Sequence, residues 1–445
     1  MILSFIDRIN SYIFGPGLCI TVFVCGIFLI LKLRPFFITK PRRIKAALMS
    51  GGTGTMSPVK AMLVALAGTL GVGNIAGVAS AIAIGGAGAV FWMLASSVAA
   101  LPIKYAEIVL AVRHRRYDKK GTAHGGAYFY ISDHKTKFAY AMAALFAALC
   151  LGASFTMGCA AQANAIAVSL NSTVGIPPIV CGFLLAAVTL SAASGGLKRI
   201  SFLTSRLIPL MSGIYILMSF FIIFTNLPTA AEVVCDIVRE AFDIRAFGGG
   251  IVGILTNHAL RIGVTRGIVS NEAGCGTAPI AHAGAETGSP AAQGVWGMFE
   301  VFIDTAVICT LTALCVLIAE KKGIAPTLDG MSTAIASFGN FIPFADMILC
   351  AAVVVFAFCT IICWFFYGTE ALGYLRNGKH CGFYQKFYLA AYSVIAVIGS
   401  VMPPDAVWSL SDLTISMMSA LNITALLLSV KEIKKETEKY FYITK

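Results

Sequence analysis

Long apolar runs dominate this chain and limit the folds that it can adopt. A helix needs roughly 20 mostly apolar residues to cross the ~30 Å hydrocarbon layer of a bilayer. About eleven windows of the sequence reach that length. They lie near residues 11–33, 58–84, 87–112, 138–170, 178–194, 200–225, 248–286, 294–319, 344–368, 384–402 and 406–430. With 58% hydrophobic and only 12% charged residues, the composition excludes a soluble enzyme and predicts an all-α polytopic membrane protein with about 11 transmembrane helices.

Basic residues occur between the apolar runs and gather on alternate sides of them. The formal net charge of +12 does not form one patch on a folded surface, so we expect no nucleic-acid partner. The bases follow the first, third, fifth, ninth and last runs: Lys32, Arg34, Lys40, Arg42, Arg43 and Lys45; Arg113, Arg115, Arg116, Lys119 and Lys120; Lys198, Arg199 and Arg206; Arg376, Lys379 and Lys386; Lys431, Lys434, Lys435 and Lys439. Loops 85–87 and 171–177 contain no Lys or Arg, and 226–247 contains more acids than bases. The positive-inside rule therefore predicts cytoplasmic basic loops, an external N-terminus, a cytoplasmic C-terminus and an odd number of spans.

The first apolar run and the thirteen cysteines have simple interpretations. The segment before the first run is short and nearly neutral, and the run is long, so we expect a retained helix rather than a cleaved signal peptide. The cysteines lie mostly within apolar runs, without a CxxC pair or a His cluster at metal spacing. They are expected to act as small hydrophobic residues. The sequence therefore predicts no enzyme cofactor and no transition-metal site.

Residues 66–86, LAGTLGVGNIAGVASAIAIGG, combine a high apolar content with closely spaced glycines and one amide, Asn74. The spacing of Gly71, Gly73 and Gly77 is one residue too long for a dinucleotide-binding G-x-G-x-x-G turn. Interior glycines weaken a helix, and lipid-facing backbone cannot leave its N–H and C=O groups unpaired. An interrupted helix must therefore face a polar site, as the discontinuous helices of secondary transporters do. The alternative is that Gly73-x-x-x-Gly77 is a close-packing face between helices.

Residues 254–286 form a second unusual run, because they place Asn271 and Glu272 among several glycines. If the first helix is set aside, the two unusual runs are the first and sixth of about ten spans, which are matching positions of a five-plus-five inverted repeat. The break in the second run lies either at Thr256–Gly263, near the middle of the span, or at Ser270–Gly276, where glycines are dense. We favour the latter.

These features divide the chain into three parts. Residues 1–50 are expected to hold an extra N-terminal helix and a basic cytoplasmic loop. Residues 51–430 are expected to form the core, with helices broken near 68–77 and 256–276, and residues 431–445 a basic cytoplasmic tail.

Five sequence blocks occur in one order along the core. They are GNIAGVA at 73–79, GGAGAVFWM at 85–93, GVTRGIVSNEAGCGTAP at 263–279, GMFEVFIDTAVICT at 297–310 and FAFCTIICWFFYG at 356–368. With these blocks the chain resembles the alanine or glycine:cation symporters of bacteria and archaea, a sodium:alanine symporter-like family, from about Gly51 to about Gly378. The resemblance implies a LeuT-type fold with an extra N-terminal helix, and cation-driven uptake of small amino acids across a prokaryotic cell membrane.

A zwitterionic amino acid needs donors for its carboxylate and acceptors for its ammonium. The N–H groups freed at Gly71, Gly73 and Asn74 suit the carboxylate, as helix N-termini suit anions. Carbonyls of both broken helices suit the ammonium. Ser270 and Asn271, beside the second break, are further predicted residues of the substrate site.

Other spans contribute the remaining predicted substrate-site residues. The resemblance points Gln162, an amide within an apolar run, into the pocket, and the alternative is a bond to a neighbouring helix. Thr360 and Trp364 lie four positions apart and therefore on one helix face. We expect Thr360 to offer a hydroxyl and Trp364 to form a wall that limits substrate size, the alternative for Trp364 being ordinary packing.

Sodium is the coupling ion that the resemblance favours. In LeuT-type carriers a recurrent cation site joins carbonyls of the first broken helix with hydroxyls of the eighth, which points here to Gly71, Val72, Cys359 and Thr360. The family usually has Thr or Ser where this chain has Val72, and it tends to Thr or Ser where this chain has Cys359. Sulfur is a softer ligand than oxygen, so we expect weaker sodium affinity than in a relative with Thr there.

Protons are the alternative coupling ion, because acids occur within the apolar runs. Lys104 and Glu107 lie three positions apart and Glu300 and Asp304 lie four apart, so each pair lines one helix face. A charge costs a few kcal/mol in hydrocarbon unless it is paired or hydrated. We favour a structural role for these pairs, neutralised toward the cytoplasmic side by Arg266 and water.

The predicted function is symport of a small neutral amino acid, of the alanine or glycine class, with sodium by alternating access. A proton-coupled amino-acid transporter is the first alternative and a channel the second. A channel would need a pore-lining repeat or a filter loop, and an enzyme would need a convergent nucleophile and base. The sequence offers neither clearly, since its six His are scattered, and we expect no enzyme. The expected partners are the amino acid, the sodium ion and the lipid bilayer.

Overall fold

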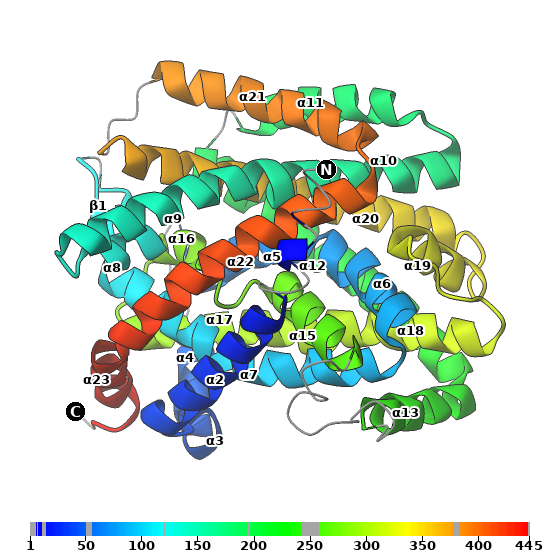
Figure 1. Cartoon of the computed structure of the whole chain (residues 1–445), viewed down its shortest axis with the longest axis horizontal. Helices are drawn as coiled ribbons and strands as arrows, with labels where there is room; N and C mark the ends of the chain where they lie inside the picture. Colours follow the sequence, from blue (N-terminus) through cyan, green and yellow to red (C-terminus); the bar gives the residue numbers. More distant parts are fainter. Residues whose placement is uncertain are drawn as a thin grey trace.

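The computed structural model describes residues 6, 8–10, 15–49, 56–119, 121–193, 196–242, 258–377 and 382–443. Helices make up nearly all of this part of the chain, and β1 (Arg116–Tyr117) and β2 (Ala123–His124) form a short antiparallel hairpin (Figure 1). The helices are α2 Gly15–Leu33, α3 Phe36–Thr39, α4 Pro41–Met49, α5 Pro58–Thr69, η2 Val72–Asn74, α6 Ala76–Gly85, α7 Gly88–Arg113, α8 Ala127–Ser132, α9 Lys137–Phe155, η3 Thr156–Ala160, α10 Ala161–Val174, α11 Pro178–Ala193, α12 Gly196–Thr225, α13 Leu227–Ala241, α15 His258–Asn271, α16 Ala278–Ala283, α17 Pro290–Val301, η5 Phe302–Cys309, α18 Thr310–Lys321, α19 Gly330–Gly339, α20 Ala345–Leu375, α21 Gly382–Val401, α22 Pro404–Leu428 and α23 Val430–Phe441.

Most described residues of the predicted apolar runs are helical, and the exceptions include breaks within the runs 58–84 and 248–286. Among the described residues, six helical stretches are long and apolar enough to cross a bilayer, and the bent pair of α5 and residues 72–85 makes a seventh if it is one span. The six are Gly88–Arg113, Lys137–Val174, Leu197–Thr225, Pro290–Lys321, Ala345–Leu375 and Ala406–Leu428. The polytopic helical architecture is therefore confirmed, whereas the total of eleven spans stays a prediction.

Part of the loop expected at 226–247 is a helix, α13. Its residues Ala230, Val233, Ile237 and Ala241 recur every three or four positions and are buried, which is the pattern of an amphipathic helix. A search for long apolar runs misses such a helix because only one of its faces is apolar.

Helix α7 is the element around which the core packs. It contacts α2, α15, α16 and α17, and small residues let these helices approach closely. Gly26 of α2 meets Ala99 of α7, and a side chain on Gly263 or Gly267 of α15 would collide with α7. At another edge of the molecule α11 and α21 lie side by side (Figure 1). The close packing fixes α15, and with it the second broken helix, against the centre of the bundle.

The first broken helix bends between α5 and α6. α5 ends at Thr69, residues Val72–Asn74 form the 3-10 turn η2, and α6 starts at Ala76. The axes of the two halves differ by 66°. Backbone groups of residues 71–74 are therefore released from regular helical hydrogen bonds, whereas the Leu70 N–H still bonds to Leu66 and the Ile75 carbonyl to Ala79.

The second broken helix consists of α15 and α16, separated by residues 272–277. Glu272, Gly274 and Gly276 adopt φ values of 51°, 89° and 77° in this break, a region that favours glycine. Of the two positions that the sequence left open, the break overlaps Ser270–Gly276, since α15 continues to Asn271, and Thr256 lies outside the described residues. The two breaks adjoin, since a Cβ on Gly73 would lie 3.7 Å from the Cα of Ser270.

Candidate substrate and cation site

The first break pairs its freed backbone groups with neutral side chains. The N–H of Gly71 donates to Asn74 Oδ1 at 3.2 Å, and the N–H of Val72 donates to Gln162 Oε1 at 3.3 Å. The hydroxyl of Thr312 donates to the carbonyl of Asn74 at 2.9 Å. These bonds satisfy buried backbone groups, and the polar atoms of a ligand could replace them without leaving a buried charge.

The amide of Asn74 ties the two breaks together. Its Nδ2 donates to Ser270 Oγ at 2.9 Å and to Asp304 Oδ1 at 2.8 Å, and the side chain is buried. The alternative of a close-packing face at Gly73 and Gly77 is wrong, because a Cβ at Gly77 would meet no atom within 4 Å and one at Gly73 would make only ordinary contact. Asn74 therefore holds the unwound turn in place.

Ser270 and Asn271 bond to η5 and to their own break. Ser270 Oγ donates to Asp304 Oδ2 at 2.7 Å, and Asn271 Nδ2 donates to Thr305 Oγ1 at 3.1 Å. Thr305 Oγ1 in turn donates to Asp304 Oδ2 at 2.9 Å, and Asn271 Oδ1 accepts from the N–H of Ala273 at 3.0 Å. Asp304 is thus the centre of a buried hydrogen-bond cluster that joins η5 to both broken helices.

Thr360 of α20 lies within a cluster of carbonyl oxygens. Its hydroxyl donates to the carbonyl of Ala67 at 2.8 Å, and the carbonyls of Phe356 and Leu70 lie 3.1 and 3.4 Å from it. Hard cations prefer such oxygen donors. Sequence reasoning identified Thr360 but missed Ala67, Leu70 and Phe356, because every residue carries a carbonyl and no side-chain signal marks the ones that converge.

Of the other predicted cation-site residues, Gly71 lies beside Thr360 and Gln162, and Val72 bonds to Gln162. A Cβ on Gly71 would lie 2.8 Å from Gln162 Oε1 and 3.0 Å from Thr360 Oγ1, so only glycine fits where the chain passes between these two side chains. Val72 contributes its N–H to Gln162. Cys359 precedes Thr360 on α20 and is fully buried.

Gln162 lies just after η3, a π-helical turn of the opposite wall. Its Nε2 donates to the carbonyl of Met157 at 3.3 Å, while its Oε1 accepts from Val72. π turns interrupt regular helices and occur often at functional sites. Gln162 bonds to a neighbouring helix, but this bond lies at the first break itself. A role in the predicted pocket and a bond between helices are therefore compatible at this position.

Trp364 fills the space between α5 and η3. Its Nε1 donates to the carbonyl of Gly68 at 3.3 Å, and its side chain lies so close to Gly158 that a Cβ there would collide with it. The indole is fully buried and packs edge-on against Tyr367, with ring centroids 5.6 Å apart. It therefore forms a rigid wall one helical turn beyond Thr360.

A cavity of about 430 Å³ borders the first break. Val72 and Ala76 of the first broken helix line it together with Arg266, Trp408 and Asp412. Arg266 Nη1 lies 3.9 Å from Asp412 Oδ1, and the guanidinium lies 5.2 Å from the centre of the Trp408 ring. This vestibule gives a path from one surface of the protein to the first break.

The buried acid Glu300 is paired with basic side chains other than the predicted Arg266. Lys104 Nζ pairs with Glu300 Oε1 at 3.3 Å, and His282 Nε2 lies 3.1 Å from Glu300 Oε2. Arg266 pairs with Asp412 and not with these acids. The expected neutralisation by Arg266 is wrong for Glu300, because its partners Lys104 and His282 come from other helices that fold against it.

Comparison with known proteins places this arrangement in a family. The Sodium:alanine symporter family matches residues 1–445. The sodium/alanine symporter AgcS of Methanococcus maripaludis is 34% identical over 99% of this chain and 98% of its own. The probable sodium/glutamine symporter GlnT of Bacillus subtilis is 30% identical over 97% of this chain and 89% of its own.

Solved structures show the same fold at low sequence identity. MhsT in complex with L-phenylalanine has a TM-score of 0.62 at 12% identity and covers 83% of this chain and 88% of its own. A substrate-bound Na⁺-coupled sialic acid symporter has a TM-score of 0.52 at 13% identity and covers 95% of this chain and 86% of its own. The chain therefore belongs to the sodium:alanine symporter family, and it is a multi-pass membrane transporter of LeuT-type fold for cation-coupled amino-acid symport.

Proposed function

We propose that this protein takes up a small neutral amino acid, of the alanine or glycine class, together with sodium by alternating access. The observation that carries the proposal is the group of oxygens around Thr360, which lies directly beside the first broken helix. There the carbonyls of Ala67, Leu70 and Phe356 lie within 3.4 Å of one hydroxyl. A sodium ion would replace the hydrogen bonds of that hydroxyl with its own oxygen coordination.

The walls of the site support a small substrate. Trp364 is held on two sides, by its bond to Gly68 and by its contact with Gly158, so it is not free to move aside for a long side chain. The N–H groups of Gly71 and Val72 are bonded to amide oxygens of Asn74 and Gln162. A substrate carboxylate would take over these donors, as anions do at helix N-termini.

The direction of transport rests on the basic loops. Lys60, Arg115, Lys198 and Arg206 all line one cavity of about 980 Å³, at the end of the molecule where the β1–β2 hairpin lies. We assign this basic end to the cytoplasm by the positive-inside rule, and the vestibule with Arg266 to the outside. The N-terminus is then external and the C-terminus cytoplasmic, in the cell membrane of a prokaryote.

Proton coupling is a second candidate, and the second break favours it. Glu107 Oε2 and Glu272 Oε1 are buried, and neither has a hydrogen-bond partner among the described residues. A buried carboxylate oxygen without a partner is costly, so each of these two oxygens is a place to hold a proton. Sodium-free uptake driven by an inward pH gradient would identify this candidate.

Uptake of labelled alanine into proteoliposomes tests the proposal. An imposed inward sodium gradient should drive accumulation above the external concentration, and collapse of that gradient should abolish accumulation. Equilibration without accumulation would identify a channel. Accumulation that is driven by an inward pH gradient and does not depend on sodium would show that protons, and not sodium, are the coupling ion.

A further inference from the structure

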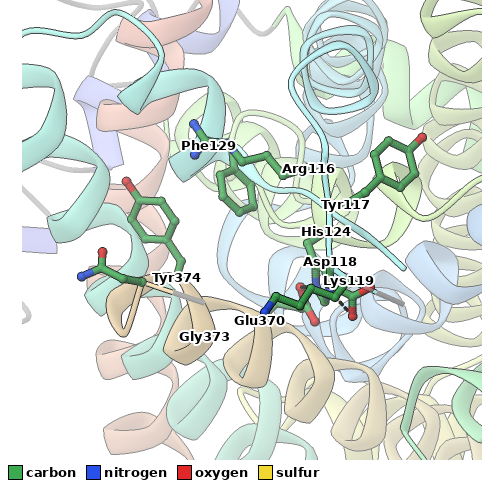
Figure 2. Close-up of a pocket in the computed structure, with 10 residues that line it drawn as sticks. Arg116, Tyr117, Asp118, Lys119, His124, Phe129, Glu370, Gly373 and Tyr374 are labelled. Carbon is green, nitrogen blue, oxygen red and sulfur yellow. Dashed lines mark hydrogen bonds and ion pairs between the residues drawn. The ribbon is translucent and has the colours of Figure 1, made fainter. Parts of the chain in front are cut away.

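The β1–β2 hairpin joins two helices that carry different parts of the site. Its strands pair Arg116 with His124 and Tyr117 with Ala123. It follows α7 in the chain and packs against α16, the inner half of the second broken helix. Figure 2 shows its residues facing the end of α20, the helix of Thr360 and Trp364.

Arg115 and Gly125, at the two ends of the hairpin, bind it to α16. Arg115 Nη1 donates to the carbonyl of Ala285 at 2.6 Å and to that of Ala283 at 3.3 Å. These carbonyls lie at or just beyond the C-terminal end of α16, where no helical donor remains and a positive charge is favoured. Gly125 lies so close to Ala283 that a Cβ on it would collide. Hairpin and α16 therefore move together.

His124 binds the hairpin to α20. Its Nδ1 lies 2.7 Å from Glu370 Oε2, and its Nε2 lies 3.6 Å from Asp118 Oδ2 (Figure 2). The imidazole thus stands between one carboxylate on α20 and one on its own hairpin. A protonated ring attracts both carboxylates, whereas a neutral ring leaves them with two negative charges facing each other across it.

The other charged or titratable groups near His124 do not bridge the hairpin to Glu370 of α20. Arg116 donates from Nη2 to Asp133 at 2.7 Å and stacks over Phe129, and Lys119 lines the same cavity of about 620 Å³ as His124. From α16, the titratable His282 faces Glu300 instead. The hydrogen bond with Glu370 is the main cause that raises the pKa of His124, and Asp118 adds to it against the effect of burial.

We propose that this hairpin, residues 115–119 and 121–125, is a latch of the inner gate, in which His124 and Glu370 position α16 against α20 and make inward opening depend on cytoplasmic pH. The proposal rests on alternating access and on the sidedness given above. Inward opening requires α16 to separate from α20, and the latch opposes that separation. Because the protonated ring holds both carboxylates, the latch is closed at low cytoplasmic pH and loosens as the pH rises through the raised pKa of His124.

A buried cysteine reports on latch opening without any transport. Gly373 of α20 is buried and lines the same cavity as His124 and Glu370, so Gly373→Cys should react faster with a membrane-impermeant maleimide when the hairpin and α16 move away from α20. The full-length protein is labelled in inside-out vesicles, in a Cys381→Ser background that removes a thiol of the predicted cytoplasmic loop. Labelling rates are compared between variants at the same pH, which cancels the pH dependence of the thiol itself.

His124→Gln should label about fivefold faster than His124 protein at about pH 6, and less than about twofold faster at about pH 8.5, because only the protonated ring closes the latch. Glu370→Gln should behave like His124→Gln. His124→Lys keeps a positive charge and should label slowly at both pH values.

His134→Gln is the matched control, since His134 is another loop histidine, bonded to Ser429 at 3.2 Å. It should not change labelling. The latch is wrong if His124→Gln and the parent label at the same relative rate at both pH values, or if His134→Gln has an equal effect. Since labelling needs no substrate or ion gradient, failure of the latch and failure of sodium-driven uptake are separate results.

Discussion

The two broken helices satisfy their freed backbone groups in different ways. At the first break, neutral amides and hydroxyls from Asn74, Gln162 and Thr312 make the bonds. At the second break, Glu107 accepts from the N–H of Gly276 at 3.0 Å, and Thr277 donates to Glu272 at 2.6 Å. The neutral bonds are ones that a substrate can replace, whereas the acid-capped turn is a fixed support.

The backbone φ angles also distinguish the two breaks. Gly274 and Gly276 have φ values of 89° and 77°, and Asn422 holds the carbonyl of Gly274 at 2.8 Å. At the first break, none of the described residues 70–75 has a positive φ. We therefore expect changes at the first break to affect transport most, and changes at the second break to affect folding most.

The largest effect is expected for Asn74→Ala. The change removes the acceptor of the Gly71 N–H and the donor to Ser270 and Asp304, and each buried group left without a partner costs about 1–3 kcal/mol. Uptake of alanine should fall by about a hundredfold or more, while the variant still inserts in the membrane. Near-normal uptake by a well-expressed variant would show that the first break is not the substrate site.

Next in size is the effect of Gly276→Ala on folding. A Cβ at this φ is strained, by about 1–3 kcal/mol, and it would also meet the ring of Phe146 at 2.8 Å. Thermal unfolding in detergent should show clear destabilisation, whereas Gly73→Ala, which makes only ordinary contacts, should unfold close to the parent protein. Equal stability of the two variants would remove the distinction between the breaks.

A moderate effect is expected for Trp364→Ala, on selectivity rather than on ion coupling. Removing the wall between Gly68 and Gly158 makes room for longer side chains, and a pocket discriminates each methylene by about 1–3 kcal/mol. The preference for alanine over leucine in competition uptake should fall by about tenfold. An unchanged preference would show that the indole only packs.

The smallest effect is expected for Cys359→Thr. A hydroxyl beside Thr360 adds a hard ligand to the oxygen cluster, so the sodium concentration for half-maximal uptake should fall by about two- to fivefold. Cys350→Thr, at a buried position earlier on the same helix, is the matched control and should not lower it. If both variants lower it equally, the effect does not come from the site.

Side chains with a distinctive type could be located from the sequence, and contacts between distant elements could not. The glycines and the lone amide of 66–86 indicated the first break, because few other reasons exist for Asn74 in an apolar run. The carbonyls of Ala67, Leu70 and Phe356 carried no such signal. The pair of Lys104 and Glu300 is 196 residues apart in the chain, so helix spacing could relate each of them only to its own helix.

The sodium dependence of alanine binding to purified Thr360→Ala protein tests the central claim most directly. Thr369→Ala is the matched control, since this hydroxyl donates to the carbonyl of Phe365 in its own helix. Loss of the hydroxyl that the carbonyls surround should raise the sodium concentration for half-maximal binding by about tenfold or more, with no change for Thr369→Ala. Alanine binding that ignores sodium, or an unchanged sodium requirement in Thr360→Ala, would contradict the assignment of sodium to this cluster.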